Sequence, residues 1–124
     1  MTPSEFQSSV YSALTALPWT AGDGGVHYSL APAGTDYPFT VFSIRSTNDP
    51  HNSGRCTKAV LTVNAYTDSN SKAHALMNII LGMDNAVITG VTGFERQAQA
   101  IEPIDGKSST TWRATANYVV WYEG

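Results

Sequence analysis

Three histidines are the side chains of this sequence that could most readily hold a metal ion or exchange a proton near neutral pH. His27 lies in an alternating segment, His51 in a polar stretch and His74 on a helical pattern. No two of them have the spacing of a metal site such as His-Glu-x-x-His. We therefore expect surface or interface roles for the histidines and predict no metal site.

A nucleophilic thiol is the second chemistry that the residue types allow. Cys56 is the only cysteine, so neither an intrachain disulfide nor a cysteine zinc site can form, and a reducing compartment fits the sequence best. A catalytic thiol would need a positioned histidine, and nothing in the sequence places one. We interpret Cys56 as a structural thiol.

Paired carboxylates are the third possibility. Glu95 and Glu102 are seven residues apart, and an odd spacing on a strand puts two side chains on opposite faces unless a bulge intervenes. Asp105 follows them in a turn.

The glycine-rich segment 22–25 precedes a strand pattern and lacks the Lys-Ser/Thr of a phosphate-binding loop. The sequence therefore predicts no catalytic residue, no cofactor site and no enzyme activity.

Composition bounds the kind of protein. At 124 residues, 42% hydrophobic and 14% charged, we expect one folded domain spanning residues 1–124. A net charge of −3 with only seven Lys and Arg argues against direct nucleic-acid binding. The sequence starts without a basic region before an apolar run, and no stretch approaches about 18 uninterrupted apolar residues. These features predict a cytosolic protein without an export signal or membrane span.

Two amphipathic helices are predicted. The first has Thr2 as N-cap and Pro3 at the first helical position, and it ends at Pro18. The second is capped by Asp68 or Ser69 and ends near Gly82. Their apolar positions recur at helical spacing: Phe6, Val10, Ala13, Leu14 and Leu17 in the first, and Ala73, Leu76, Met77, Ile80 and Leu81 in the second.

Strand patterns occupy most of the remaining sequence. Alternating or β-branched segments predict strands over residues 26–30, 37–45, 57–67, 94–104 and 111–123. Residues 46–54 are almost all turn formers and predict a long polar loop. The last two strands form a hairpin around Asp105-Gly106. We therefore predict an α+β fold, with a mostly antiparallel sheet of four to five strands and both helices packed on one face.

The last strand carries aromatic side chains on both faces. Tyr118, Val120 and Tyr122 share one face, which must meet the helices. Val119 and Trp121 share the other, where an apolar patch would mark a subunit contact. The alternative is that the loop from Trp19 to Gly25 folds over that face.

Three stretches together resemble the phage tail-completion family, also called tail terminators or head-to-tail joining proteins. They are the strand segment 37–42 (Tyr-Pro-Phe-Thr-Val-Phe), the segment 63–68 running directly into the second helix, and the ending 112–122, which closes on Val-Trp-Tyr. With the opening helix, this order covers nearly the whole chain. The loop 46–54 departs from the pattern in length and polarity.

The resemblance implies a structural protein of the virion, assembled in the host cytoplasm, with no catalysis. Such a protein forms a ring, typically a hexamer, that caps the head-proximal end of the tail tube, stops tube growth and docks the head. Its partners would be its own copies, the tail-tube protein and a head-completion or connector protein. DNA would pass through the lumen without specific binding, which suits an acidic chain.

A closed ring requires a heterologous interface, in which one patch of each subunit meets a different patch of the next. We expect the outer face of the terminal hairpin to supply one patch and the polar loop to reach the neighbour or the lumen. The predicted interface residues are Asn48, Asp49, His51, Asn52, Arg55, Val119 and Trp121. Alternative functions are a head-side connector or stopper, or a small cytosolic α+β enzyme or ligand-binding domain with a pocket between helices and sheet.

Overall fold

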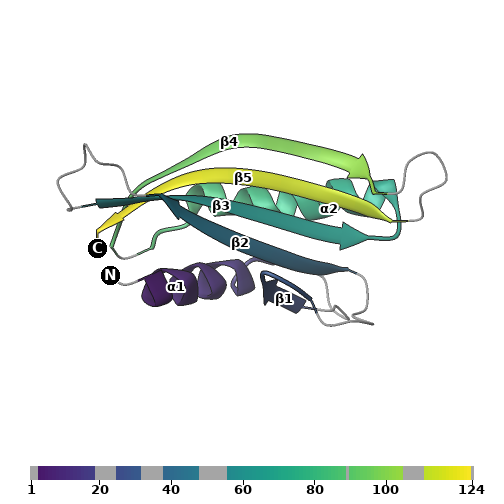
Figure 1. Cartoon of the computed structure of the whole chain (residues 1–124). Helices are drawn as coiled ribbons and strands as arrows, with labels where there is room; N and C mark the ends of the chain where they lie inside the picture. The colour runs from purple at the N-terminus through teal and green to yellow at the C-terminus, as the bar shows by residue number, and fades with distance from the viewer. Residues whose placement is uncertain are drawn as a thin grey trace.

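The computed structural model describes residues 3–18, 25–31, 38–47, 56–88, 90–104 and 111–123. Its five strands form one sheet in the order β1-β2-β3-β5-β4, in which only the β1–β2 pair is parallel. The predicted α+β class and mostly antiparallel sheet are confirmed. The strands are β1 (Gly25–Tyr28), β2 (Phe39–Thr47), β3 (Cys56–Thr67), β4 (Val91–Pro103) and β5 (Trp112–Glu123) (Figure 1).

Helix α1 spans Pro3–Thr15 and follows the predicted apolar stripe, with Phe6, Val10 and Leu14 fully buried. It ends three residues before Pro18, earlier than predicted. The Thr15 hydroxyl donates to the carbonyl oxygens of Tyr11 and Ser12, both at 3.0 Å, in its last turn. The predicted N-cap, Thr2, lies outside the described residues.

Helix α2 spans Asn70–Ile80, and its N-cap is Ser69 rather than Asp68. The Lys72 backbone N–H donates to Ser69 Oγ at 3.3 Å, which satisfies one of the free amides of the first turn. The α-helix ends at Ile80, close to the predicted end at Gly82, and a 3₁₀ segment, η1 (Leu81–Asn85), follows it. This segment was not predicted, and it buries Met83 completely.

Both helices pack on the same face of the sheet, which we call the helix face. The Phe6 ring of α1 stacks on Tyr122 with centroids 4.3 Å apart, and the Tyr118 hydroxyl of β5 donates to the Ile80 carbonyl of α2 at 3.4 Å. Both tyrosines belong to the buried side of β5, whose members are Ala114, Ala116, Tyr118, Val120 and Tyr122. In Figure 1, α2 lies behind β3 and β5, and α1 lies beside β2.

The strand boundaries differ slightly from those predicted. β4 begins at Val91, three residues early, and carries register shifts between Val91 and Gly93 and between Arg96 and Ala98. β1 ends before Ser29, whose positive φ of 69° breaks the extended backbone. The predicted Asp105-Gly106 turn lies outside the described residues.

Candidate subunit interface

The sheet has a second face, opposite the helices, that we call the open face. It is formed by the side chains of β2, β3, β5 and β4 that alternate with the buried ones. Among the described residues no helix or strand lies over it. Most of its side chains are half-buried, because they shield one another across the strands without being covered from above. The described part of the chain therefore leaves this face uncovered.

At one end of the open face, three apolar side chains form a cluster. Val119 lies opposite Val60 of β3, and Trp121 is the next open-face residue of β5. A Cβ placed on Gly93 would lie only 2.7 Å from Trp121 Cε3, so the indole lies against the glycine backbone of β4. The glycine leaves room for the ring to lie along the sheet, where it stays half-buried.

At the other end, four side chains cross the sheet in one row. Phe39 pairs with Tyr66, Tyr66 with Arg113, and Arg113 with Glu102. The Phe39 and Tyr66 rings stack with centroids 5.0 Å apart, and Arg113 forms an ion pair with Glu102. The hydrogen bond that Arg113 donates to the Glu102 carboxylate raises the pKa of Arg113 above its ordinary value. The row therefore presents an aromatic pair beside a neutralised charge pair.

The middle of the open face is polar. The Thr115 hydroxyl donates to Asn64 Oδ1 at 2.7 Å, and Thr62 and Asn117 are the next pair along the same two strands. The Thr115–Asn64 bond thus joins a hydroxyl and an amide across β3 and β5. The open face is thus apolar at one end, polar in the middle and aromatic with charges at the other end.

Two of the seven predicted interface residues, Val119 and Trp121, lie on the open face. The predicted alternation of β5 is confirmed, because Tyr118, Val120 and Tyr122 are buried. The other five predicted residues (Asn48, Asp49, His51, Asn52 and Arg55) lie outside the described residues. So do residues 19–24, so a cover over the open face by that loop stays a prediction.

Glu95 and Glu102 lie on the same face, because the bulge that the odd-spacing argument allowed as an exception is present. The register shift between Arg96 and Ala98 inserts one residue, so both carboxylates fall on the open face, opposite Val119 and Arg113. They still form no acid–base pair, since Glu102 is held by Arg113 at the far end of the strand. Within the described residues no three His, Cys, Asp or Glu side chains are grouped as metal ligands.

Two buried tyrosines behave differently on the helix face. Burial raises the pKa of the Tyr118 phenol well above its usual range, and the nearby Asp84 carboxylate adds to this. Asp84 itself pairs with Arg96 at 3.0 Å, which ties η1 to β4. The Tyr122 hydroxyl, by contrast, is buried without a hydrogen-bond partner among the described residues.

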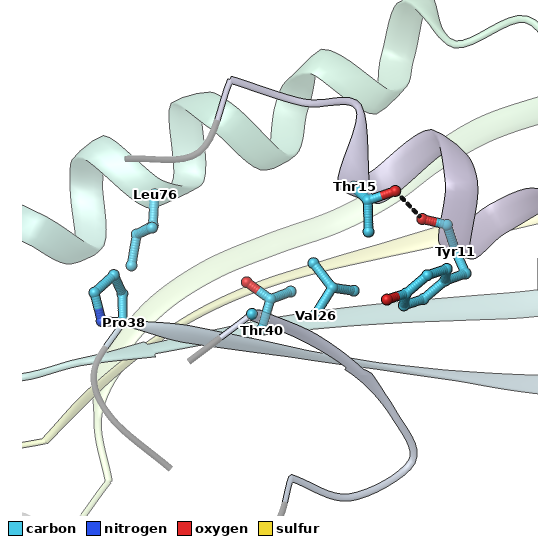
Figure 2. Close-up of a pocket in the computed structure, with 7 residues that line it drawn as sticks. Tyr11, Thr15, Val26, Pro38, Thr40 and Leu76 are labelled. Carbon is cyan, nitrogen blue, oxygen red and sulfur yellow. Dashed lines mark hydrogen bonds between the residues drawn. The ribbon is translucent and has the colours of Figure 1, made fainter. Parts of the chain in front are cut away.

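A cavity of about 270 Å³ lies between the helices and the sheet. It is lined by Tyr11, Thr15, Gly25, Val26, Pro38, Thr40 and Leu76. Figure 2 shows Tyr11 and Thr15 of α1 on one side and Leu76 of α2 with Pro38 on the other. The Thr15 hydroxyl is bonded to the Tyr11 carbonyl, so the lining offers mainly apolar surface. The sequence did not indicate these residues, because they come from four separate elements.

Comparison with known proteins gives no assignment: no protein-family model matches the chain, and no curated protein matches it. Among the described residues, none of the helices combines the length and the apolar character needed to cross a membrane.

Proposed function

We propose that this chain is a virion assembly protein of the tail-completion type. In this role its copies form a ring, of about six subunits by the resemblance, that caps the head-proximal end of the tail tube, ends tube growth and provides the docking surface for the head. The tail-tube protein and a head-completion or connector protein are its partners. DNA passes through the lumen, and the acidic chain does not retain it.

The observation that carries this proposal is the open face. A sheet with both helices on one side leaves the cluster of Val60, Val119 and Trp121 uncovered among the described residues. Half-buried aromatic and aliphatic side chains on an uncovered face are typical of protein contact surfaces. The resemblance of the strand and helix order to tail-completion proteins supports the same role.

The test has two parts. Purified protein is mixed with tail tubes assembled from the tube protein encoded in the same gene neighbourhood, and tube ends are imaged by electron microscopy. A ring at one end of each tube, with tube length fixed, is the expected result. Trp121→Glu should abolish capping while the thermal melt of the variant stays cooperative. Uncapped tubes with the wild-type chain, or a neighbourhood without head and tail genes, would contradict the proposal.

A head-side connector or stopper is the second structural role. It uses the same kind of contact surface but a different partner, so the assay above separates the two. A connector binds the portal or head-completion ring and leaves bare tube ends free.

A ligand-binding domain is a third candidate, and the cavity between helices and sheet favours it. Its volume of about 270 Å³ suits a small apolar molecule. Thermal shift with small aromatic probes tests this role, because a ligand that binds only the folded chain raises the melting temperature. Leu76→Trp should fill the cavity and remove such a shift.

A further inference from the structure

The sheet ends in two open edges. β4 is the last strand on one side, and its outer backbone groups meet no strand among the described residues. On the other side, β1 pairs only with Phe39–Phe42 of β2. The remaining part of β2, residues 43–47, is therefore a second open edge within the described chain. Unpaired N–H and C=O groups at such edges are a template for another strand.

One row of the open face joins these two edges. The register pairs Arg45 with Val60, Val60 with Val119, and Val119 with Glu95. Arg45 is thus on the β2 edge and Glu95 on the β4 edge, at the same level along the strands and on the same face. Both side chains are exposed, and neither forms an ion pair with a described residue. Opposite charges at opposite ends of one row are complementary between copies.

Strand direction allows the two edges to meet. β2 runs antiparallel to β3, β3 to β5, and β5 to β4, so β2 and β4 run in opposite directions. When a second copy is placed beside the first in the same orientation, the β4 edge of one copy lies antiparallel to the β2 edge of the next. Because Arg45 and Glu95 are at the same level along the strands, this placement brings Glu95 of one copy beside Arg45 of its neighbour. The two side chains then lie on the same face as cross-strand partners.

We propose that copies of this chain join edge to edge, with β4 residues 93–98 pairing with β2 residues 43–47 of the next copy and Glu95 bonding Arg45 across the junction. The contact is heterologous, because each copy uses its β4 edge on one side and its β2 edge on the other. This inference rests on the self-association in the proposed function and names the surface that makes it.

A groove lies beside the β2 edge. A groove of about 220 Å³ lies on the helix side of this edge and is lined by Ser4, Phe6, Gln7, Tyr28, Ile44 and Ser46. The row through Ser46, Ala59 and Val120 ends at Phe94 of β4. In the proposed ladder, Phe94 of one copy therefore lies next to Ser46 of the neighbour, at the mouth of this groove.

The two register shifts of β4 limit the length of the junction. They fall between Val91 and Gly93 and between Arg96 and Ala98, so only a short regular segment lies between them. Bulges of this kind restrict pairing along an edge strand. A single junction is consequently short, and it includes the Glu95–Arg45 charge pair. Closure into a ring adds one junction without adding a subunit.

Charge reversal tests the junction. We expect Arg45→Glu and Glu95→Arg each to weaken self-association at least about tenfold, because each places like charges together across the junction. The double variant should recover wild-type association. An equimolar mixture of the two single variants should also recover it, because every junction in an alternating assembly again pairs opposite charges. Sedimentation at several concentrations measures association, and thermal melts show that each variant folds.

Cysteine pairing gives an independent measurement. In a Cys56→Ser background, Arg45→Cys combined with Glu95→Cys should give a ladder of covalent oligomers under oxidation, since directly opposed residues of an antiparallel pair have Cα atoms about 4.5–5.5 Å apart, a separation that a disulfide can span. Arg45→Cys alone should give no covalent dimer, because a heterologous junction never brings two copies of one residue together. The control Thr62→Cys with Glu95→Cys should not cross-link, since Thr62 lies on the interior strand β3.

The outcomes separate this inference from the proposed function. Wild-type rings that survive both single charge reversals and give no cysteine ladder would overturn the edge junction and leave tail completion standing. Covalent dimers from Arg45→Cys alone would overturn it too, because they show an isologous contact. A wild-type chain that remains monomeric at the highest concentration reached also overturns it, while tube capping decides the tail-completion role separately.

Discussion

Two stacked aromatic pairs lie on opposite faces of the same sheet. Phe6 and Tyr122 stack on the helix face with centroids 4.3 Å apart and are almost fully buried. Phe39 and Tyr66 stack on the open face at 5.0 Å and remain half-exposed. The geometry of the two pairs is similar, but only the first is removed from water by a helix. Burial, rather than ring stacking, therefore separates the part of the molecule that holds the fold from the part available to partners.

The largest expected effect comes from breaking the buried pair. Phe6→Ala should lower the free energy of unfolding by about 3–5 kcal/mol, because it removes a fully buried ring and leaves a cavity under α1. Phe39→Ala is the matched control and should lower it by less than about 1.5 kcal/mol, since water already reaches that pair. Urea denaturation measures both. Equal losses for the two variants would show that the open face is covered in solution.

An intermediate effect is expected at the glycine beneath Trp121. Gly93→Ala adds a Cβ that would lie 2.7 Å from Trp121 Cε3, so the indole must shift. We expect this shift to lower the free energy of unfolding by about 1–3 kcal/mol. In a Trp121→Ala background the same substitution should be nearly neutral, because the clash is absent. Additive losses in this double-mutant cycle would mean that the indole does not lie on Gly93.

A smaller effect, of opposite sign, is expected from a buried hydroxyl. Tyr122→Phe removes a hydroxyl that has no hydrogen-bond partner among the described residues, so stability should stay unchanged or rise by up to about 1 kcal/mol. Tyr118→Phe is the control: it removes the donor to the Ile80 carbonyl and should lower stability by about 0.5–1.5 kcal/mol. Thermal denaturation compares the two. A clear loss for Tyr122→Phe would indicate a partner for its hydroxyl.

The two faces also differ in how well the sequence predicted them. The alternation of buried residues in β5 and the apolar positions of both helices could be predicted from the sequence, because burial on one side imposes a regular period. The position of Glu95 relative to Glu102 was not, since the register shift after Arg96 depends on the pairing of β4 with β5. The row from Arg45 to Glu95 was equally hidden, because it joins four strands whose register no local pattern encodes.

The smallest effect concerns an exposed pair at the start of α2. Lys72 Nζ lies 3.1 Å from Asp68 Oδ1, and this hydrogen bond lowers the pKa of Asp68 below its ordinary value. A lowered pKa means that the pair stabilises the folded chain above the pKa of the unfolded carboxyl, and that this contribution is lost as the pH falls through the folded pKa. NMR titration should therefore give a pKa below 3.8 for Asp68. Lys72→Met should return it toward that value, and an unchanged titration in this variant would mean that another group holds the carboxylate.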